Sequence, residues 1–587
     1  MKSSIALSLV TAMIILMNLA PTPALAFRQE PVSDTPAATV VFSLPQAPEA
    51  GKFTLYEQNG AAACREATAE EAGVFQHAPG VTLHPISHAN SYAVSEKESG
   101  LKIILRATAQ LERFPEAKAA FLKSAAVWEE KIQSPITIVI DVDFGPTYFG
   151  HTWPQFSLGS SSAQELVSPN VYETARARLI ASATDEQQLA VYNALPTGAI
   201  PTDLGSTTTM TGPSANARAL GLLDPVADPD GKEKYLGSPP EVAFNSNYKF
   251  DFDPGDGIDS DKIDFEAVAV HEIGHVLGFI SKTGARELDG KAPIAPTVWD
   301  LFRLRPATPQ ERFSAASRVL SSGGEQMFTV AGLELPLSTG RPDGSGGDHF
   351  QASHWKNDDL IDHRYIGVME VGLPTGKRQV MTAHDLLAIK MMGYALKTGI
   401  EMAPEIGGFS GKMQDDTLTI TGIAASAAND LAEAEVKVLD DSGTVLAQYP
   451  LARLTLGASS VAGFALQLPG INQWRAATQA SLTFLDRIGN RSSTLTTGIL
   501  EGDSGGPRLS SLSFDGSVLQ IKGKRLSQHL SLEVNGEVVP VSNLTAKGSG
   551  KKAQVAATAA DLRLSGGPNR VRVIEDGSRS NAMILNL

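Results

Sequence analysis

The chain has 587 residues, of which 42% are hydrophobic and 19% are charged, and its formal net charge is −15. This composition is that of a globular protein rather than a disordered or membrane-embedded one, and the length predicts several domains. The negative charge argues against nucleic acid or an anionic membrane surface as a partner.

Residues 1–26 predict an export signal. Lys2 precedes an apolar run that ends at Met17, and the Ala-Leu-Ala sequence at 24–26 fits the small-x-small cleavage rule. The run is short for a permanent anchor, because a bilayer span takes about 20 residues. We therefore expect cleavage after Ala26 and a secreted protein, extracellular or periplasmic, with no membrane span in its mature form.

The segment 27–96 shows no sustained period, so we interpret it as an N-terminal pro-region or accessory segment. It contains Cys64, the one cysteine of the chain, which therefore has no partner for a disulfide within the chain.

Residues 97–400 combine helical and strand patterns, which predicts an α+β domain. Arg113 to Ile132 has apolar residues at helical spacing, and Pro135 to Asp143 is a β-branched run. Further helices are expected at about 171–195, 268–280 and 383–395, the last beginning with a capping box of Thr382 and Asp385.

Beyond about residue 404 the pattern changes to short alternating strands separated by Gly, Asn and Asp turns, which is typical of β-sandwiches. We expect one sandwich module at 401–502 and a second at 507–587. The part from Val518 to Leu587 resembles an Ig-like module of the IPT/TIG kind, and such modules act as spacers or contact surfaces and glycans.

The segment from Asp264 to Ile280 carries the clearest chemical signal. His271 and His275 are four residues apart, so on a helix both imidazoles project from one face and can share a Zn²⁺ ion at ~2.0–2.1 Å. Glu272 can act as the general base that takes a proton from a metal-activated water. The alternative is a buried helix with two ordinary histidines.

The stretch from His271 to Phe279, His-Glu-Ile-Gly-His-Val-Leu-Gly-Phe, resembles the metzincin zinc proteases and in particular their leishmanolysin-like branch. The general metzincin pattern continues to a third histidine three residues after Gly278. That position holds Ser281 here, which is a poor zinc ligand. In the leishmanolysin-like branch the third histidine follows an insertion.

The resemblance therefore implies that His354, in the sequence Ser-His-Trp, is the third zinc ligand. His349 is the alternative, and His363 and His384 are weaker candidates. The resemblance also implies a methionine turn that ends at Met369 under the metal, although this residue equally fits an ordinary core methionine.

Three other signals have competing interpretations. The carboxylates between Asp251 and Asp261 could bind Ca²⁺, but their spacing fails the EF-hand pattern and favours a solvated turn. The sequence Gly-Asp-Ser-Gly-Gly-Pro at 502–507 matches the nucleophile segment of trypsin-like proteases at Ser504, but it fits a linker better. Cys64 could bind the zinc and keep an enzyme latent, or be an ordinary free thiol.

The sequence thus predicts a multidomain protein in which an α+β zincin, metzincin-like catalytic domain is followed by two all-β sandwich domains. The predicted function is a secreted zinc endopeptidase that hydrolyses peptide bonds in extracellular proteins, with His271, His275 and His354 on the metal. The alternative is an adhesin or surface-binding protein whose metal site is structural or degenerate.

Overall fold

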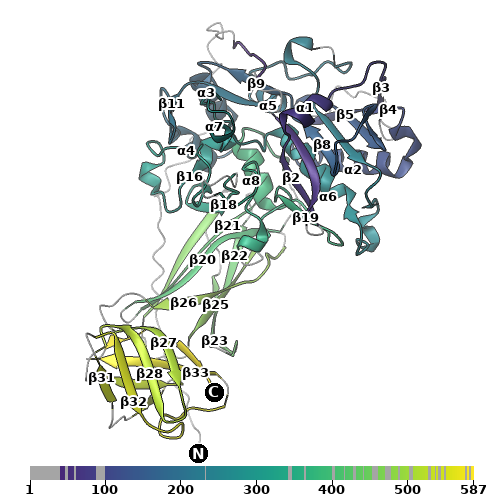
Figure 1. Ribbon diagram of the computed structural model, residues 1–587. Helices are drawn as coiled ribbons and strands as arrows, with labels where there is room; N and C mark the ends of the chain where they lie inside the picture. The colour runs from purple at the N-terminus through teal and green to yellow at the C-terminus, as the bar shows by residue number, and fades with distance from the viewer. Residues whose placement is uncertain are drawn as a thin grey trace, which may run out of the picture.

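The computed structural model describes most of the chain from residue 40 onward (Figure 1). The described ranges are 40–45, 51–58, 61–86, 100–231, 233–340, 347–361, 365–398, 403–414, 417–426, 431–440, 442–451, 461–469, 477–486, 490–501, 507–526, 530–535, 537–539, 544–547, 550–566, 568–575, 578–580 and 583–587. The export signal at 1–26, the residue His363 and the Ser504 segment lie outside them.

An eight-stranded mixed sheet forms the centre of the main body, in the order β19-β2-β1-β8-β13-β5-β4-β3. Strands β4, β5 and β13 run parallel to one another, and the other neighbours pair antiparallel. The strands are β1 (Lys52–Gln58), β2 (Ala61–Glu66), β3 (Leu83–Ile86), β4 (Lys102–Thr108), β5 (Thr137–Gly145), β8 (Ser157–Ser162), β13 (Glu241–Asn245) and β19 (Gly372–Pro374).

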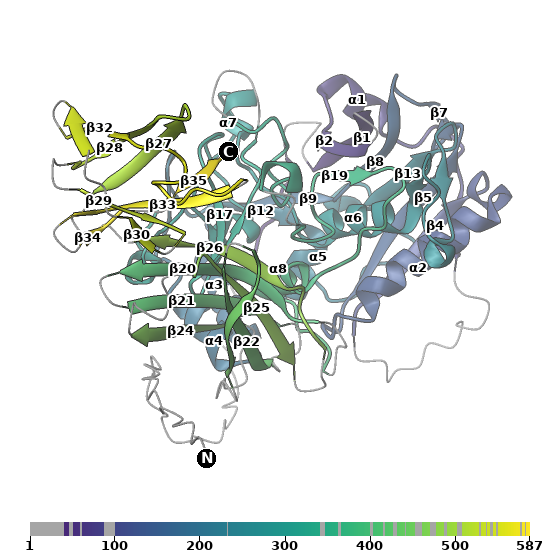
Figure 2. The ribbon, with the colours of Figure 1, turned by 90° about the horizontal axis from the view of Figure 1, so that it is seen from below.

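The two faces of this sheet carry different layers, because side chains alternate along a strand. Val242 and Phe244 of β13 belong to the large core, whereas Ala243 packs in a small cluster with Phe75 and Tyr148. Helices α2 (Pro115–Glu129) and α6 (Phe265–Leu277) lie on the large-core face, and α1 (Ala69–Val74) lies on the opposite face (Figure 2). Residues 51–86 thus contribute three strands and one helix to the main body.

The remaining elements of the main body are short. The helix predicted at 171–195 is two helices, α3 and α4, because the Asp185 side chain accepts from the Gln188 N–H and starts a new helix. The capping box predicted at Thr382 and Asp385 is present. The helices are α3 (Tyr172–Ser182), α4 (Glu186–Asn193), α5 (Ser214–Ala219), α7 (Ala285–Leu288) and α8 (Ala383–Met391), with 3-10 turns η1 (Leu111–Arg113), η2 (Lys234–Leu236), η3 (Pro254–Asp256), η4 (Trp299–Phe302), η5 (Gln310–Arg312) and η6 (Asp358–Leu360).

Five small sheets surround the central one. Their strands are β6 (Thr147–Tyr148) with β7 (His151–Thr152), β9 (Glu165–Ser168) with β12 (Met210–Pro213), β10 (Ile200–Thr202) with β11 (Gly205–Thr207), β14 (Phe250–Asp251) with β15 (Ile263–Asp264), and β16 (Arg303–Leu304), β17 (Met327–Val330) and β18 (Leu333–Pro336).

Two β-sandwich modules follow the main body (Figure 1). The first consists of β20 (Glu405–Gln414), β21 (Thr417–Ala425), β22 (Leu431–Leu439), β23 (Val445–Leu451), β24 (Val461–Pro469), β25 (Gln479–Asp486) and β26 (Leu495–Glu501). The second consists of β27 (Arg508–Phe514), β28 (Val518–Lys524), β29 (Ser531–Val534), β30 (Glu537–Val539), β31 (Leu544–Lys547), β32 (Lys552–Ala556), β33 (Pro568–Glu575), β34 (Ser578–Arg579) and β35 (Met583–Asn586).

The first sandwich is anchored in the core of the main body. Ala425 and Val461 belong to the large hydrophobic cluster of the main body rather than to the core of their own module. Gln187 on α4 completes the contact, because its side chain donates to the Val461 carbonyl and accepts from the Val461 N–H, each at 3.1 Å.

The predicted fold class, with an α+β zincin catalytic domain, is wrong. Strands account for 38% of the chain and helices for 20%, so the protein is mostly β-sheet. The helical periods at 113–132 and 268–280 were easy to recognise, but most strands of the main body are short or buried on both faces and therefore show no alternation. Only the strand at 135–143 was predicted in this region.

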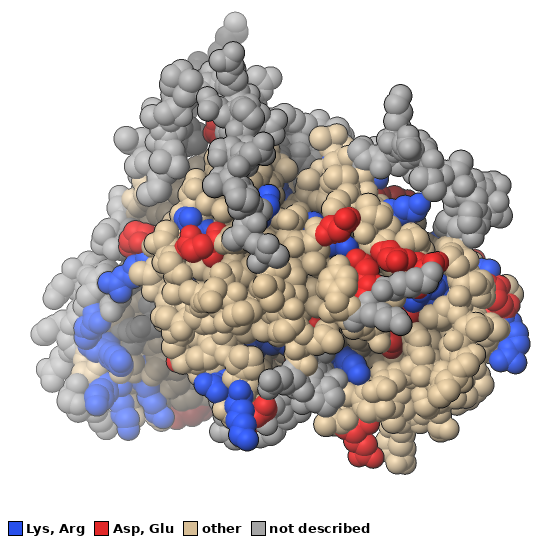
Figure 3. All heavy atoms as spheres, turned by 90° about the horizontal axis from the view of Figure 1, so that it is seen from above, with Lys and Arg blue, Asp and Glu red and all other residues tan. Residues whose placement is uncertain are grey.

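No described helix is long and apolar enough to cross a membrane. On the face seen in Figure 3, acidic and basic side chains are scattered singly or in small groups over a largely uncharged surface.

Trp128 joins α2 to α6, and we expect its replacement to be costly. The side chain is fully buried, and its indole N–H donates to the Val270 carbonyl at 2.9 Å. Trp128→Ala should destabilise the main body by about 3–5 kcal/mol through the cavity it leaves. In thermal unfolding, the exposed aromatic Tyr235 (68% exposed) provides the control, because Tyr235→Ala should change stability by less than about 0.5 kcal/mol. Equal effects of the two changes would contradict this assignment.

Candidate metal centre

Helix α6 carries the predicted metal ligands and is buried over its whole length. The Asp264 side chain caps its first turn by accepting from the Ala267 N–H at 3.0 Å. Arg378 bridges Asp264 and Glu266 from outside. The helix ends at Gly278, whose φ of 151° lies in a region that L side chains rarely adopt. These contacts fix where the helix begins and ends, and so fix the positions of His271 and His275 along the helix axis.

The structure brings the side chains of His271, His275 and His354 together. The Nε2 atom of His271 lies 3.2 Å from the Nε2 atom of His275 and 3.2 Å from that of His354. All three side chains are fully buried. The third ring comes from the loop after β18, 79 residues beyond His275 in the sequence.

Each ring is oriented by its other nitrogen. The Nδ1 atoms of His271, His275 and His354 lie 2.8, 2.6 and 2.9 Å from the backbone carbonyl oxygens of Val368, Phe279 and Gln351. A carbonyl only accepts, so each Nδ1 carries the proton and each Nε2 presents a lone pair. Three lone pairs at this separation repel one another unless a cation lies between them.

The spacing fits zinc. Ligand nitrogens at ~2.0–2.1 Å from a tetrahedral Zn²⁺ are roughly 3.3–3.4 Å apart, close to the 3.2 Å between the imidazole nitrogens. Cys64 on β2 completes the set, because its Sγ lies 3.7 Å from the His275 Nε2. The four ligand atoms all lie within 4.8 Å of one another. In the described part of the chain this is the one group of three or more candidate ligands that gathers in this way.

Burial keeps the three histidines neutral, as metal ligands must be. Desolvation lowers the pKa of His271 to about 4, and it lowers the pKa values of His275 and His354 well below their ordinary range. Desolvation and the nearby Glu272 raise the pKa of the Cys64 thiol. A bound dication reverses that preference, since a coordinating thiol is deprotonated outright.

Glu272 lies beside the histidine cluster, and one of its carboxylate oxygens is hydrogen-bonded while the other is not. Ser161 on β8 donates a short hydrogen bond to its Oε2. Its Oε1 lies 4.0 Å from the His271 Nε2 and has no hydrogen-bond partner among the described residues. Burial raises the pKa of Glu272 to about 8. An orphaned carboxylate oxygen beside the metal ligands is suited to receive a proton from a water bound there.

Met369 lies beneath α6. A Cβ atom built on Gly274 would overlap the Met369 sulfur, so only glycine allows this approach. Asp385, which completes the capping box of α8, holds the same turn by accepting from the Val368 N–H at 2.9 Å and from the Trp355 indole N–H at 2.8 Å. It thereby connects the carbonyl that orients His271 with the residue after His354.

A buried arginine fixes the loop that carries His354. Arg303 on β16 donates to the Ser338 carbonyl at 3.0 Å and also to the Ala352 carbonyl. Ser338 in turn donates its N–H to the His354 carbonyl at 3.1 Å. The backbone contact at Ser338 and these two hydrogen bonds of Arg303 together connect the long segment between α6 and His354 to the candidate metal centre.

Other predicted site residues lie elsewhere. His349 is not part of the ligand group, and the buried His384 lies with its Nδ1 3.1 Å from the Ile366 carbonyl oxygen. In the acidic loop, Asp251 accepts from the N–H groups of Asp253 and Asp259 at 3.1 and 3.0 Å. Its carboxylate oxygens are thus used in a local turn, and the described acidic residues of this loop form no group of candidate metal ligands.

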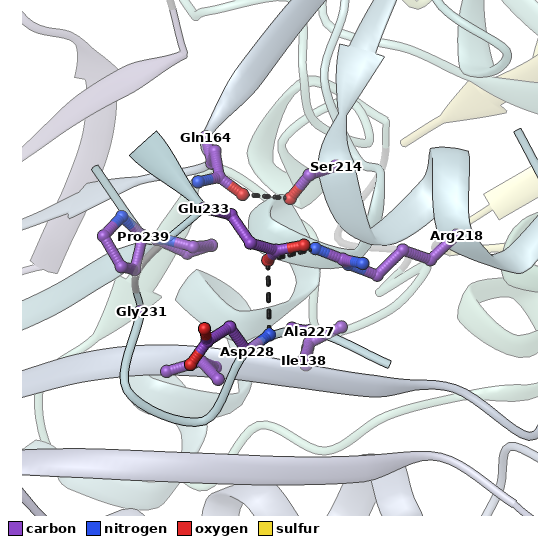
Figure 4. Close-up of a pocket in the computed structure, with 11 residues that line it drawn as sticks. Ile138, Gln164, Ser214, Arg218, Ala227, Asp228, Gly231, Glu233 and Pro239 are labelled. Atoms are coloured by element: carbon purple, nitrogen blue, oxygen red, sulfur yellow. Dashed lines mark hydrogen bonds and ion pairs between the residues drawn. The ribbon is translucent and has the colours of Figure 1, made fainter. Parts of the chain in front are cut away.

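A separate hollow lies near the start of β5, away from the histidines (Figure 4). Its polar groups satisfy one another: Arg218 pairs with Glu233 at 2.5 Å, and Ser214 donates to Gln164 at 2.5 Å. This arrangement leaves the metal cluster as the main chemical feature of the described residues.

Sequence reasoning missed two neighbours of the cluster. Ser161, which bonds Glu272, lies in a serine-rich strand without any motif. Phe53 on β1 stacks on His275 with ring centroids 4.3 Å apart. Neither contact has a local signal, because both arise from strand pairing between β1 and β8.

Comparisons with known proteins do not assign a family. No family model matches the sequence, and no curated protein matches it. Similar solved structures include SGBP-B from a complex xyloglucan utilization locus in Bacteroides uniformis (10% identity, TM-score 0.12, 31% of this chain and 48% of that one). Others are titin Ig tandem domains A164-A165 (11%, 0.14, 32% and 97%) and Drosophila OTK extracellular domains 3-5 (13%, 0.14, 33% and 66%). Likeness at these TM-scores assigns neither fold nor function.

Metal content tests the ligand set. We expect purified full-length protein to hold about one zinc ion per chain, and His354→Ala to lose it, because the remaining ligands bind more weakly. His349→Ala should keep the metal and is the matched control. Atomic emission on the three proteins measures the ratio; loss of zinc in His349→Ala with retention in His354→Ala would contradict the site.

Proposed function

We propose that the protein is a zinc-dependent endopeptidase, as the resemblance to metzincin proteases implies. The observation that carries this proposal is Glu272, whose free, buried Oε1 lies beside the His271 Nε2. A metal site that served only stability would gain nothing from an uncompensated carboxylate, since burying one is costly.

In this proposal the residues of the cluster have three roles, as metal ligands, as general base and as a positioning residue. His271, His275 and His354 would hold the metal, with their rings oriented by backbone carbonyls. Zinc bound there would supply a Lewis acid that acidifies a water and polarises a peptide carbonyl. Glu272 would take the proton of the attacking water through Oε1 and pass it to the departing amine. Ser161 would hold the carboxylate in place through Oε2.

We further propose that the full chain is latent. Cys64 lies where a fourth zinc ligand would be, and catalytic sites need that position for water. The strand that carries Cys64 is paired on both sides, with β1 and β19, so the thiol is held firmly. The Cys64 thiol would have to leave the metal, by loosening or removal of residues 51–86, before water could take the fourth position.

The substrate class is protein or peptide in the extracellular or periplasmic space. The export signal expected at 1–26 supports this location, and the two sandwich modules would provide contacts with a cell surface or with glycans.

The alternative is a surface-binding protein in which the sandwich modules act and the metal is structural. One observation favours it: a site of three histidines and one cysteine is closed, as structural zinc sites are. This alternative gives Glu272 no role, and that difference can be measured.

Glu272→Gln should keep the zinc and lower turnover by about 10²–10⁴-fold, because the amide cannot accept the proton. The variant is made in the Cys64→Ser background. Its zinc-dependent cleavage of an unfolded, dye-labelled protein is measured before and after limited trypsin digestion of the enzyme. Glu130→Gln, at an exposed position, is the control and should have no effect. Retained turnover in Glu272→Gln would refute the mechanism.

Cys64→Ser should raise the zinc-dependent activity of the undigested full chain, because serine is a weak zinc ligand and leaves the fourth position to water. We expect an increase of at least about tenfold over the wild-type full chain. If zinc is bound but neither the variant nor its digested form cleaves protein, the structural alternative is the better description.

A further inference from the structure

The N-terminal segment, residues 51–86, is attached to the main body by strand pairing and by side-chain contacts on both faces of the central sheet. Its strands pair with β8, β19 and β4. On the face of the sheet opposite α6, Phe75 packs against Tyr148 with ring centroids 4.9 Å apart, and the Ala78 N–H donates to the Phe149 carbonyl at 3.0 Å. Cys64 can leave the metal only if these attachments loosen.

In this opposite-face attachment, His77 pairs with two buried carboxylates. Its Nε2 lies 3.1 Å from the Oε1 of Glu241 on β13 and 3.8 Å from the Oδ2 of Asp141 on β5. Its ring also stacks on Phe149 with centroids 4.4 Å apart. The imidazole is 25% exposed, whereas Asp141 and Glu241 are almost fully buried.

The charges around His77 balance only when it is protonated. Arg106 on β4 forms a two-point ion pair with Asp141, at 2.6 and 2.8 Å. Among the described residues, the partners of the Glu241 carboxylate are His77 and the Tyr148 hydroxyl, which donates to its Oε2 at 2.5 Å. With His77 protonated, two cations face two carboxylates. With His77 neutral, one buried carboxylate lacks a counter-charge, which is costly.

We propose that protonated His77 locks the N-terminal segment onto Glu241 and Asp141, and that loss of its proton as the pH rises loosens the segment that holds Cys64 at the metal. The consequence for activity rests on the peptidase function proposed above. The lock itself depends only on contacts on the other face of the sheet.

The direction of the effect follows from the surroundings of His77. Burial alone would lower its pKa, but the adjacent carboxylate of Glu241, followed by that of Asp141, raises the pKa above the ordinary value. A group whose pKa is higher in the folded state stabilises below its unfolded pKa of about 6.5 and loses that contribution as the pH rises through the folded value. The segment should therefore be most firmly held in mild acid.

Hydrogen exchange of the full-length chain tests the lock. The Glu272→Gln form prevents self-cleavage, and it can be studied from about pH 5.5 to 8.5, which spans the ordinary histidine pKa. After correction for intrinsic exchange rates, protection of peptides from 61–86 should fall above pH ~6.5. The fall should be up to about tenfold for each unit by which the pKa of His77 is higher in the folded than in the unfolded state. The Ala78 amide, which bonds Phe149, is the most direct reporter.

Two variants give the controls. His77→Gln should show low protection of 61–86 that no longer changes across this pH range. His84→Gln is the matched control, because His84 lies on β3 of the same segment and pairs with Glu112 at 2.8 Å, but at an exposed position. It should behave like the parent protein, and strands β22 and β25 should report any general effect of pH.

Two results would overturn the proposal. One is protection of 61–86 that does not depend on pH in the parent protein, and the other is a pH dependence of this protection that persists in His77→Gln. A second readout uses the single thiol: labelling of Cys64 in metal-free protein, normalised to the unfolded chain at each pH, should rise with the same pH step and lose it in His77→Gln. Neither readout needs turnover, so failure of the lock and failure of the peptidase function remain distinguishable.

Discussion

Three hydrogen bonds from imidazole Nδ1 atoms to backbone carbonyls orient the candidate metal ligands, and the geometry of the cluster depends on them. They turn the lone pairs of His271, His275 and His354 toward one point, where they repel one another unless a cation is present. The carbonyls belong to the segment just after α6, the turn before Met369 and the loop before His354. The orientation of the three imidazoles therefore depends on the packing of these three segments.

That packing is achieved by a few buried contacts. Asp385 caps α8 and at the same time holds the Val368 N–H and the Trp355 indole, so one carboxylate orders two of the three segments. Burial raises the pKa of Asp385 to about 6, and the hydrogen bonds it accepts favour its charged form. Gly274 allows the Met369 sulfur to lie against α6. The site thus combines close packing with a small number of oriented polar groups.

The N-terminal segment gives the site its unusual character. One face of its strands presents Phe53 and Cys64 to the metal ligands, and the same segment places His77 among charged groups on the opposite face. The central sheet therefore connects the candidate metal site with a titratable attachment. A latent peptidase and a permanently closed structural site share this geometry, and they differ in what Glu272 contributes.

The sequence by itself determined the local features: the helix that bears His271, Glu272 and His275, and the capping box of α8. These depend on periodicity and on residues three or four apart, which a sequence displays directly. The choice of His354 over His349 rested on a family resemblance, and the mostly β architecture was missed. Only the tertiary structure decided where Cys64, Ser161 and His77 lie, because strand pairing brings together residues that are far apart in the chain, and no local pattern records such a contact.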